Sequence, residues 1–296
     1  MNLAAAGKSS APTLTLPVER GGKFVFEFGD TSFEVDPALG ARVTSWKLDG
    51  AELLTGPDVD PGNFGSTFWP SPQSAWDWPP PAEIDHLPYD GGLRGATVTL
   101  KSQTSPSLGL GVTKSFTPDL VKGGVIVEYT LENRGSQVTR VAPWEITRLF
   151  PRGMCFFPTG GAPYTNHLIL PENADVAGVT FVPYDAAKIS SHQKLFADGR
   201  GGYLAHADPS ARALIVKVFE DITAAQAAPG EGEIEIYFDG QRGYIELEQQ
   251  GAYAELAPGQ AFSWKVGWYL RKIPESVAVV AGSAELVALA ASVAAR

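Results

Sequence analysis

Apolar and polar residues alternate along several short segments of the chain. The clearest of these segments are residues 23–28, 125–129, 213–218, 233–238 and 262–268. A period of two with many β-branched and aromatic residues is typical of half-buried strands. The 32 glycines and 23 prolines separate such segments at short intervals, as turns require. Residues 274–295, rich in Ala, Val and Leu, carry the clearest helical pattern.

This order of elements predicts an all-β fold. Many strands without alternating helices favour a large, twisted antiparallel β-sandwich with a short C-terminal helix. We expect residues 1–16 to be a flexible N-terminal segment and residues 17–296 to be a single domain, because no repeat or long linker divides them. Residues 57–93 differ, since their eight prolines and three tryptophans predict a long ordered loop.

Composition and charge argue against several classes of function and partner. The formal net charge of −10 and the lack of a Lys/Arg cluster argue against nucleic acid as a partner. No stretch approaches the roughly 20 apolar residues of a membrane span. Cys155 is the single cysteine, which excludes an intramolecular disulfide. The first twelve residues lack the apolar core of a signal peptide, so the compartment, bacterial cytoplasm or periplasm, stays open, as does the oligomeric state.

The predicted loop contains the first candidate site. Trp69, Trp76 and Trp78 can provide flat apolar walls, and Gln73 and Asp77 can provide directional hydrogen bonds. Pyranose rings combine apolar C–H faces with polar rims, so this combination suits a carbohydrate ligand. Alternatively, these tryptophans close one end of the sandwich as part of the core.

A second candidate is the segment from Trp144 to Arg148. In a strand, Trp144, Ile146 and Arg148 share one face and Glu145 lies on the other. Glu145 either points into a polar cleft or forms a structural ion pair with an arginine such as Arg148 or Arg152.

The third candidate is a set of glutamates. Glu246 and Glu248 share one face of a predicted strand, as Glu233 and Glu235 do in the preceding one. Neighbouring carboxylates raise one another's pKa, which suits general acid/base chemistry or a bound cation such as calcium. A solvated outer face of the sheet is the alternative.

The histidines and the search for metal motifs give little evidence for a particular function. His86 lies within the tryptophan-rich segment and His192 lies close to Lys194, and each can also be an incidental surface or core residue. No pair of histidines or cysteines has the spacing of a transition-metal site, and no nucleotide-binding glycine motif is present. The sequence therefore predicts no required cofactor and no metal, although calcium is left open.

Three segments together resemble the galactose mutarotase-like (aldose 1-epimerase) superfamily. They are residues 33–54 with their Gly50-Ala51-Glu52-Leu53-Leu54 corner, residues 247–250 (Leu-Glu-Gln-Gln), and residues 256–268 with a Pro-Gly turn and two tryptophans. The tryptophan-rich segment and residues 144–148 resemble a bacterial domain of unknown function, DUF4380. The resemblance implies a mutarotase-like β-sandwich with a sugar site on its concave face.

The resemblance also assigns roles to individual residues. In mutarotases a glutamate takes the proton of the anomeric hydroxyl and a histidine protonates the ring oxygen. Glu248 matches the base, and His86, then His192, is our candidate for the acid. The segment that carries a histidine in the family is replaced by residues 144–148, and the family's Gly-Arg-x-Ala-Asn-Arg signature is missing.

The combined prediction is a protein that acts on or binds a sugar. Glu248, Glu145 and His86 are the catalytic candidates, and the substrate-binding candidates are Trp69, Gln73, Trp76, Trp78, Trp144, Arg148, His192 and Glu246. We expect Glu145 and Arg148 to line the same concave face as Glu248. Two alternatives remain: a non-catalytic carbohydrate-binding protein, and a glycosidase or lyase that uses Glu145 and Glu248 as paired carboxylates.

Overall fold

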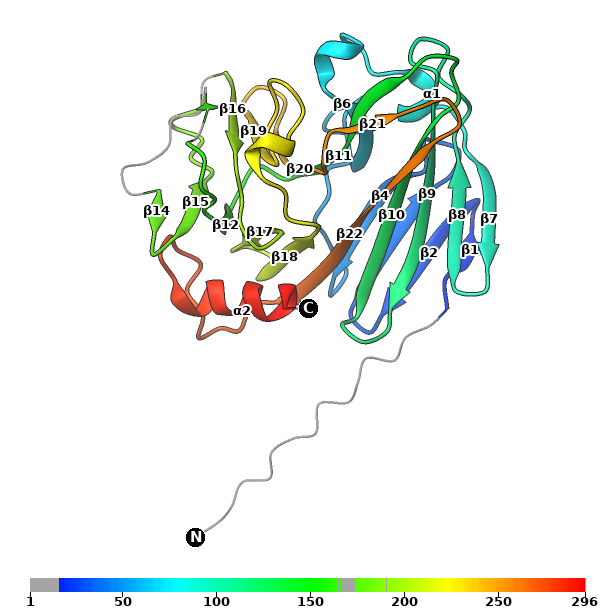
Figure 1. Cartoon of the computed structure of the whole chain (residues 1–296). Coiled ribbons are helices and arrows are strands. Elements are labelled where there is room, and N and C mark those ends of the chain that lie inside the picture. Colours follow the sequence, from blue (N-terminus) through cyan, green and yellow to red (C-terminus); the bar gives the residue numbers. More distant parts are fainter. Residues whose placement is uncertain (1–15, 164, 167–173, 190, 296) are drawn as a thin grey trace.

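Two antiparallel β-sheets packed face to face make up most of the protein (Figure 1). The computed structural model describes residues 16–163, 165–166, 174–189 and 191–295. The all-β sandwich with a short C-terminal helix is therefore confirmed. The predicted flexible segment, residues 1–16, lies outside the described residues except for Leu16.

The first sheet carries the site described below. Within the described residues it has 12 strands, in the spatial order β1 (Val18–Arg20), β2 (Lys23–Phe28), β3 (Thr31–Asp36), β4 (Arg42–Leu48), β6 (Ser66–Ser71), β11 (Thr139–Leu149), β20 (Tyr244–Gln250), β19 (Ile234–Asp239), β16 (His192–Ala197) and β13 (Thr165–Asn166), with β5 (Ala51–Glu52) on β4 and β21 (Ala254–Leu256) on β11.

The second sheet covers the inner face of the first. Its 10 strands in the described residues follow the order β14 (Asp175–Val176), β15 (Val179–Pro183), β12 (Met154–Pro158), β17 (Tyr203–Asp208), β18 (Ala213–Val218), β22 (Ala261–Lys272), β10 (Gly124–Asn133), β9 (Leu110–Asp119), β8 (Thr97–Lys101) and β7 (Asp90–Arg94). The connections include the short helices α1 (Ala82–Asp85), η1 (Gln73–Ala75) and η2 (Ala224–Gln226).

The main core lies between the two sheets and follows from the alternation in sequence. In β2, Phe24, Phe26 and Phe28 point inward and are buried, whereas the residues between them are partly exposed. Aromatic rings from both sheets meet in this layer: Trp268 of the second sheet lies 4.9 Å from Trp46 of the first, centroid to centroid. Each fully buried large apolar side chain stabilises the fold by about 1.5–3 kcal/mol relative to an exposed one.

A second, smaller core lies under the C-terminal helix α2 (Ala284–Ala294). Leu286, Ala290 and Val293 recur at helical spacing and are buried against the outer face of β17 and β18. The helix begins at Ser283, whose side chain accepts a hydrogen bond from the N–H of Leu286. The predicted helix over residues 274–295 is thus confirmed only from Ala284 onward.

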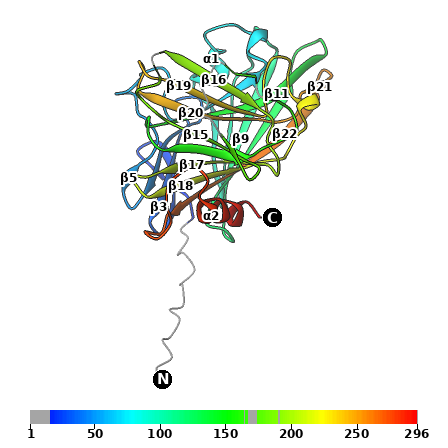
Figure 2. The ribbon, with the colours of Figure 1, turned by 90° about the vertical axis from the view of Figure 1, so that its left-hand side faces the viewer.

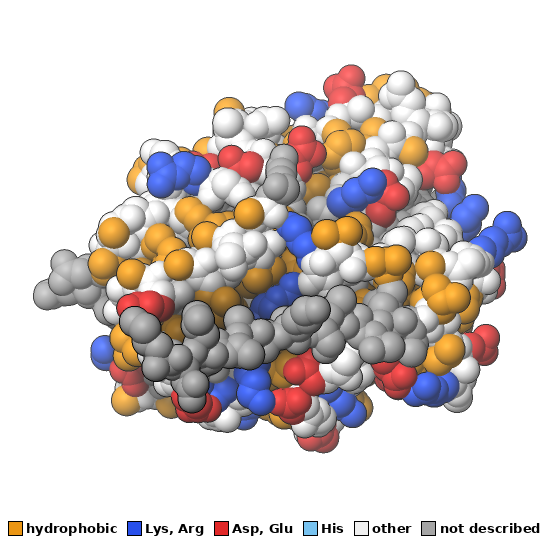
Figure 3. All heavy atoms as spheres, turned by 90° about the horizontal axis from the view of Figure 1, so that it is seen from below, with side chains coloured by type: hydrophobic (Ala, Val, Ile, Leu, Met, Phe, Trp, Pro, Cys, Tyr) orange, Lys and Arg blue, Asp and Glu red, His pale blue; other side chains and the backbone are white. Residues whose placement is uncertain are grey.

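Helix α2 lies at the lower end of the molecule, opposite α1 (Figure 2). Seen from below, apolar side chains lie among acidic and basic ones (Figure 3). No helix in the described part of the chain has both the length and the apolar character that a membrane span needs.

The prediction of one long loop over residues 57–93 is wrong for its middle part. Residues 66–71 form β6, which pairs with β11 near the middle of the first sheet, and all six of its residues are buried. The prolines make this strand hard to recognise from the sequence, because proline has no N–H group to donate to the hydrogen bonds of a sheet. The register sets Pro70 opposite Pro143, so the two residues without an N–H group share one position of the ladder.

Candidate functional site

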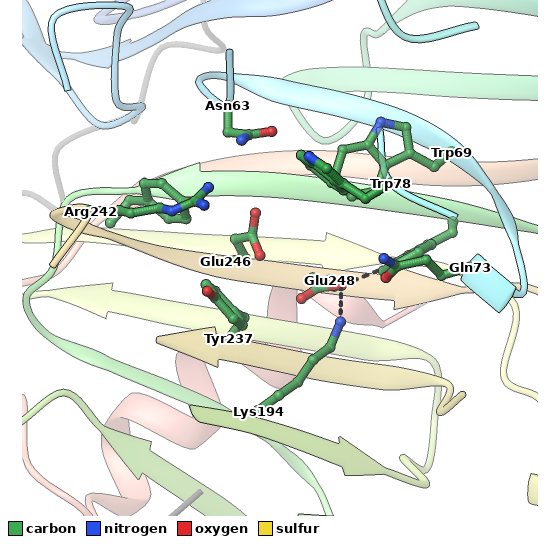
Figure 4. Close-up of a pocket in the computed structure, with 11 residues that line it drawn as sticks. Asn63, Trp69, Gln73, Trp78, Lys194, Tyr237, Arg242, Glu246 and Glu248 are labelled. Atoms are coloured by element: carbon green, nitrogen blue, oxygen red, sulfur yellow. Dashed lines mark hydrogen bonds and ion pairs between the residues drawn. The ribbon is translucent and has the colours of Figure 1, made fainter. Parts of the chain in front are cut away.

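The outer face of the first sheet holds a cavity of about 290 Å³ (Figure 4). Strands β6, β11, β20, β19 and β16 run side by side beneath it, and alternation along each strand brings every second side chain to this face. The cavity is lined by Asn63, Trp69, Gln73, Trp78, Trp144, Lys194, Tyr237, Arg242, Tyr244, Glu246 and Glu248. Six of these were predicted from the sequence: Trp69, Gln73, Trp78, Trp144, Glu246 and Glu248.

Glu248 is fully buried, and one of its two carboxylate oxygens accepts two hydrogen bonds. Its Oε2 accepts a hydrogen bond from Trp144 Nε1 at 2.9 Å and another from Lys194 Nζ at 3.0 Å. Its Oε1 has no hydrogen-bond partner in the described part of the chain. A buried carboxylate oxygen without a donor is costly, so Oε1 is the atom of Glu248 that a ligand can bind with most gain.

Lys194 connects two carboxylates beneath the cavity. Its Nζ lies 2.6 Å from Glu235 Oε2 and 3.0 Å from Glu248 Oε2, and 4.8 Å from the centroid of the Trp144 ring. Burial lowers the pKa of Lys194, but the charges of Glu235 and Glu248 outweigh burial and raise this pKa above its ordinary value. Burial also raises the pKa of Glu235 well above the ordinary value. The lysine therefore stays positively charged at neutral pH.

Glu246 lines the cavity two residues before Glu248, on the same face of β20. The buried Arg148 places its Nε 2.8 Å from Glu246 Oε1, and its guanidinium lies 5.2 Å from the centroid of the Trp69 ring. Burial raises the pKa of Glu246 to about 7, although Arg148 acts in the opposite direction. Glu246 can therefore give or take a proton near neutral pH.

Tryptophans form one wall of the cavity. Trp69 is buried, and its ring meets those of Trp78 and Trp144 edge to face, at centroid distances of 5.7 and 5.4 Å. Trp69 Nε1 donates to Asp85 Oδ1 at 2.7 Å, which fixes the ring. Trp78 is 54% exposed, and Asp77 before it adopts a φ of +53°, a conformation that Asp tolerates better than most residues. An exposed tryptophan at the cavity mouth is suited to contact a ligand.

The opposite rim of the cavity is polar, and Arg242 contacts three side chains there. This guanidinium lies 3.5 Å from the hydroxyl of Tyr244 and makes ion pairs with Asp60 at 3.6 Å and with Asp239 at 3.5 Å. Tyr237 also lines this end, and its hydroxyl donates to Asp239 at 2.9 Å.

The placement of Glu145 overturns three expectations. Its carboxylate points to the inner face of the first sheet, where Oε1 lies 2.7 Å from Lys217 Nζ and Oε2 accepts from Trp268 Nε1 at 3.0 Å. Tyr129 and Gln249 donate to the same carboxylate. Glu145 therefore does not line the cavity or pair with an arginine, and it cannot act as a paired carboxylate with Glu248. Alternation along β11 places it opposite Trp144 and Arg148.

Three further predicted residues lie near the cavity without lining it. His86 is half-exposed and its Nδ1 lies 3.4 Å from Asp85, the residue that holds Trp69. His192 is exposed and stacks on Tyr237 at 6.3 Å. Neither imidazole is among the groups that line the cavity. Trp76 packs edge to face on Trp69 at a centroid distance of 5.8 Å, and its Nε1 donates to the carbonyl oxygen of Pro70 at 2.6 Å.

Sequence reasoning missed five lining residues: Asn63, Lys194, Tyr237, Arg242 and Tyr244. Alternation offered a signal for two of them, because Tyr237 shares a face with Glu235 and Tyr244 shares a face with Glu246. The described residues contain no group of three or more His, Cys, Asp or Glu side chains placed to hold a metal ion.

Comparison with known proteins identifies the fold of this chain. No family model and no curated protein sequence matches the chain. A solved galactose mutarotase-like protein from Lactobacillus casei has a TM-score of 0.59 at 13% identity, with 84% of this chain and 100% of that chain covered. The chain has the galactose mutarotase-like fold.

Two further solved structures agree with this mutarotase-like fold. A galactose mutarotase related enzyme from Lactobacillus acidophilus has a TM-score of 0.59 at 7% identity, with 86% of this chain and 98% of that chain covered. A protein from Synechocystis has a TM-score of 0.57 at 15% identity, covering 90% and 100%. At these identities the likeness is one of fold, and the resemblance to DUF4380 stays a prediction.

Proposed function

We propose that the protein binds a reducing sugar in the cavity of the first sheet and interconverts its anomers by proton transfer, with Glu248 as the base. One observation carries the proposal: Glu248 is buried with Oε2 held by two donors, while Oε1 has no hydrogen-bond partner among the residues that the structure describes. This arrangement orients one carboxylate oxygen for a ligand hydroxyl before the ligand arrives.

The composition of the cavity supports a sugar as the ligand. Trp69 and Trp78 offer apolar ring surfaces to the C–H face of a pyranose, and Gln73, Asn63 and Tyr237 offer polar groups to its hydroxyls. A cavity of about 290 Å³ lies just below the roughly 300–1,000 Å³ typical of ligand pockets. It therefore suits a ligand of about one sugar ring.

In the proposed reaction Glu248 Oε1 takes the proton of the anomeric hydroxyl. The neutral carboxyl of Glu246 gives its proton to the ring oxygen as the bond between that oxygen and the anomeric carbon breaks. The open-chain aldehyde rotates, and the reverse transfers close the other anomer, so protons balance over the cycle. The pKa of Glu246, about 7, suits an acid that must release and recover a proton near neutral pH.

A non-catalytic sugar-binding protein is the second candidate, and Lys194 favours it. An ammonium group 3.0 Å from Glu248 Oε2 forms an ion pair with the carboxylate that the reaction would need as its proton acceptor. In that case the same cavity holds a sugar without changing it.

Exchange spectroscopy by NMR tests the proposal with a panel of reducing monosaccharides. We expect wild-type protein to speed exchange between the anomers of at least one of them. Glu248→Gln, which keeps the shape but removes the base, is expected to lower that rate by about 10²–10⁴-fold while the sugar still binds. Glu19→Gln, an exposed change in the edge strand β1, is the matched control and should leave the rate unchanged.

Equal exchange rates in wild type and Glu248→Gln would remove Glu248 from the mechanism. Binding without faster exchange in the wild type would select the non-catalytic candidate.

A further inference from the structure

A second cavity of about 150 Å³ lies on the same side of the first sheet, towards its β16 edge. Phe196 of β16 and Asp198 directly after that strand line it, together with Glu231 and Glu233, which lie just before β19. Ala227, directly after η2, forms part of its wall.

Two contacts join the second cavity to the first. Lys194 and Phe196 lie two residues apart on β16, which spaces them by roughly 7 Å on one face. Lys194 Nζ lies 4.8 Å from the Trp144 ring in the first cavity and 5.3 Å from the Phe196 ring in the second. Glu231 Oε1 accepts a hydrogen bond at 2.9 Å from the backbone N–H of Gln73, which lines the first cavity. The two cavities are therefore neighbours, and Lys194 and the contact of Gln73 with Glu231 lie where they meet.

The second cavity repeats the chemistry of the first. Phe196 is only partly buried and offers an aromatic face. Asp198 Oδ2 accepts from the N–H groups of Gly161 and Ala162 at 2.7 and 3.0 Å, whereas its Oδ1 has no partner in the described residues. An aromatic surface beside hydrogen-bond acceptors suits a second sugar ring.

Charge restricts which ring fits. The described residues that line the second cavity include three carboxylates, Asp198, Glu231 and Glu233, and no lysine or arginine. The carboxylate of Glu233 is occupied by the N–H groups of Ile222 and Gly199, each at 2.8 Å. An acidic sugar would meet like charge there, whereas the hydroxyls of a neutral sugar can donate to these oxygens.

We infer that the ligand is a neutral oligosaccharide, with its reducing-end ring beside Glu248 and the next ring over Phe196. This inference rests on the proposed function, because it assigns a sugar to the first cavity. It adds that the preferred substrate has at least two rings.

Affinities of matched monosaccharides and disaccharides test the inference. Titration calorimetry compares D-glucose with cellobiose and maltose, D-galactose with β-1,4-galactobiose, and D-xylose with xylobiose. We expect at least one disaccharide to bind about tenfold more tightly than its monosaccharide, because the second ring adds contacts. Ala227→Trp, which fills the second cavity, should abolish this difference and leave the monosaccharide affinity unchanged.

Ala225→Trp is the matched control, since Ala225 lies in η2, is exposed and does not line the cavity. Phe196→Ala tests the same point by removing the aromatic surface without adding bulk. Equal affinities for each disaccharide and its monosaccharide, or equal losses for both in Ala227→Trp, would overturn the inference and leave the proposed function standing. Failure of every sugar to bind the wild type would overturn both.

Discussion

Two buried glutamate–lysine pairs lie on opposite faces of β11 and β20, and they differ in what surrounds them. On the inner face, Glu145 and Lys217 lie 2.7 Å apart, both fully buried. On the outer face, Glu248 and Lys194 lie 3.0 Å apart, and the lysine side chain is 19% exposed.

The inner pair is closed. Both oxygens of Glu145 accept hydrogen bonds, and Lys217 also donates to Thr147 at 2.9 Å. Burial lowers the pKa of Lys217 to about 7, against the charge of Glu145. In the outer pair, the charges of Glu235 and Glu248 raise the pKa of Lys194, and Glu248 Oε1 has no hydrogen-bond partner within the described parts of the chain. The satisfied pair joins the two sheets, whereas the half-satisfied pair at the cavity leaves one acceptor for the ligand that we propose.

Breaking the closed pair should have the largest effect on stability. Lys217→Met leaves the charge of Glu145 buried without its cation, and we expect it to lower the free energy of unfolding by about 3–5 kcal/mol. Urea denaturation measures this loss.

The double variant Glu145→Gln, Lys217→Met is the control, because it removes both charges and keeps a side-chain oxygen as acceptor. It should recover part of the loss. A Lys217→Met protein as stable as wild type would show that the inner pair does not hold the sheets together.

Breaking the outer pair of Glu248 and Lys194, the open pair, should lower the free energy of unfolding by less. This loss should depend on pH. Lys194→Met leaves Glu235 and Glu248 adjacent, as register partners on β19 and β20, without the cation between them. We expect a loss of about 1–3 kcal/mol at neutral pH. Burial already raises the pKa of Glu235 well above its ordinary value, and removing the cation raises this pKa further. The loss should therefore grow as pH rises from about 5 to 8.

Lys265→Met is the control for this variant. Lys265 is 64% exposed and lies 3.6 Å from Glu128 on the surface, so its removal should cost at most about 1 kcal/mol. A Lys194→Met loss that is constant from pH 5 to 8 would contradict the account of the open pair.

The sequence predicted which side chains share a face but not which face is inside. Alternation separates Glu145 from Trp144 and Arg148 because side chains of a strand point to opposite sides in turn. On the inner face of β11, Glu145 pairs with Lys217. This lysine comes from the facing sheet and lies 72 positions further along the chain. No local pattern contains that contact.

The same limit applies to the cavity. Glu248 could be proposed from its motif, yet its hydrogen bond to Trp144 joins residues 104 positions apart. Lys194 carried no signal, because a lone lysine in a strand is usually solvated. The prolines near Trp69 concealed β6, so the tryptophan wall was expected on a loop rather than partly on a buried strand.

A crystal structure of the wild-type protein soaked with a reducing sugar tests the central claim most directly. We predict that the anomeric hydroxyl lies about 2.6–3.2 Å from Glu248 Oε1, with the sugar ring against Trp78 and with Trp144 and Lys194 still holding Oε2. A sugar bound elsewhere, or with its anomeric hydroxyl turned away from Glu248, would contradict the account.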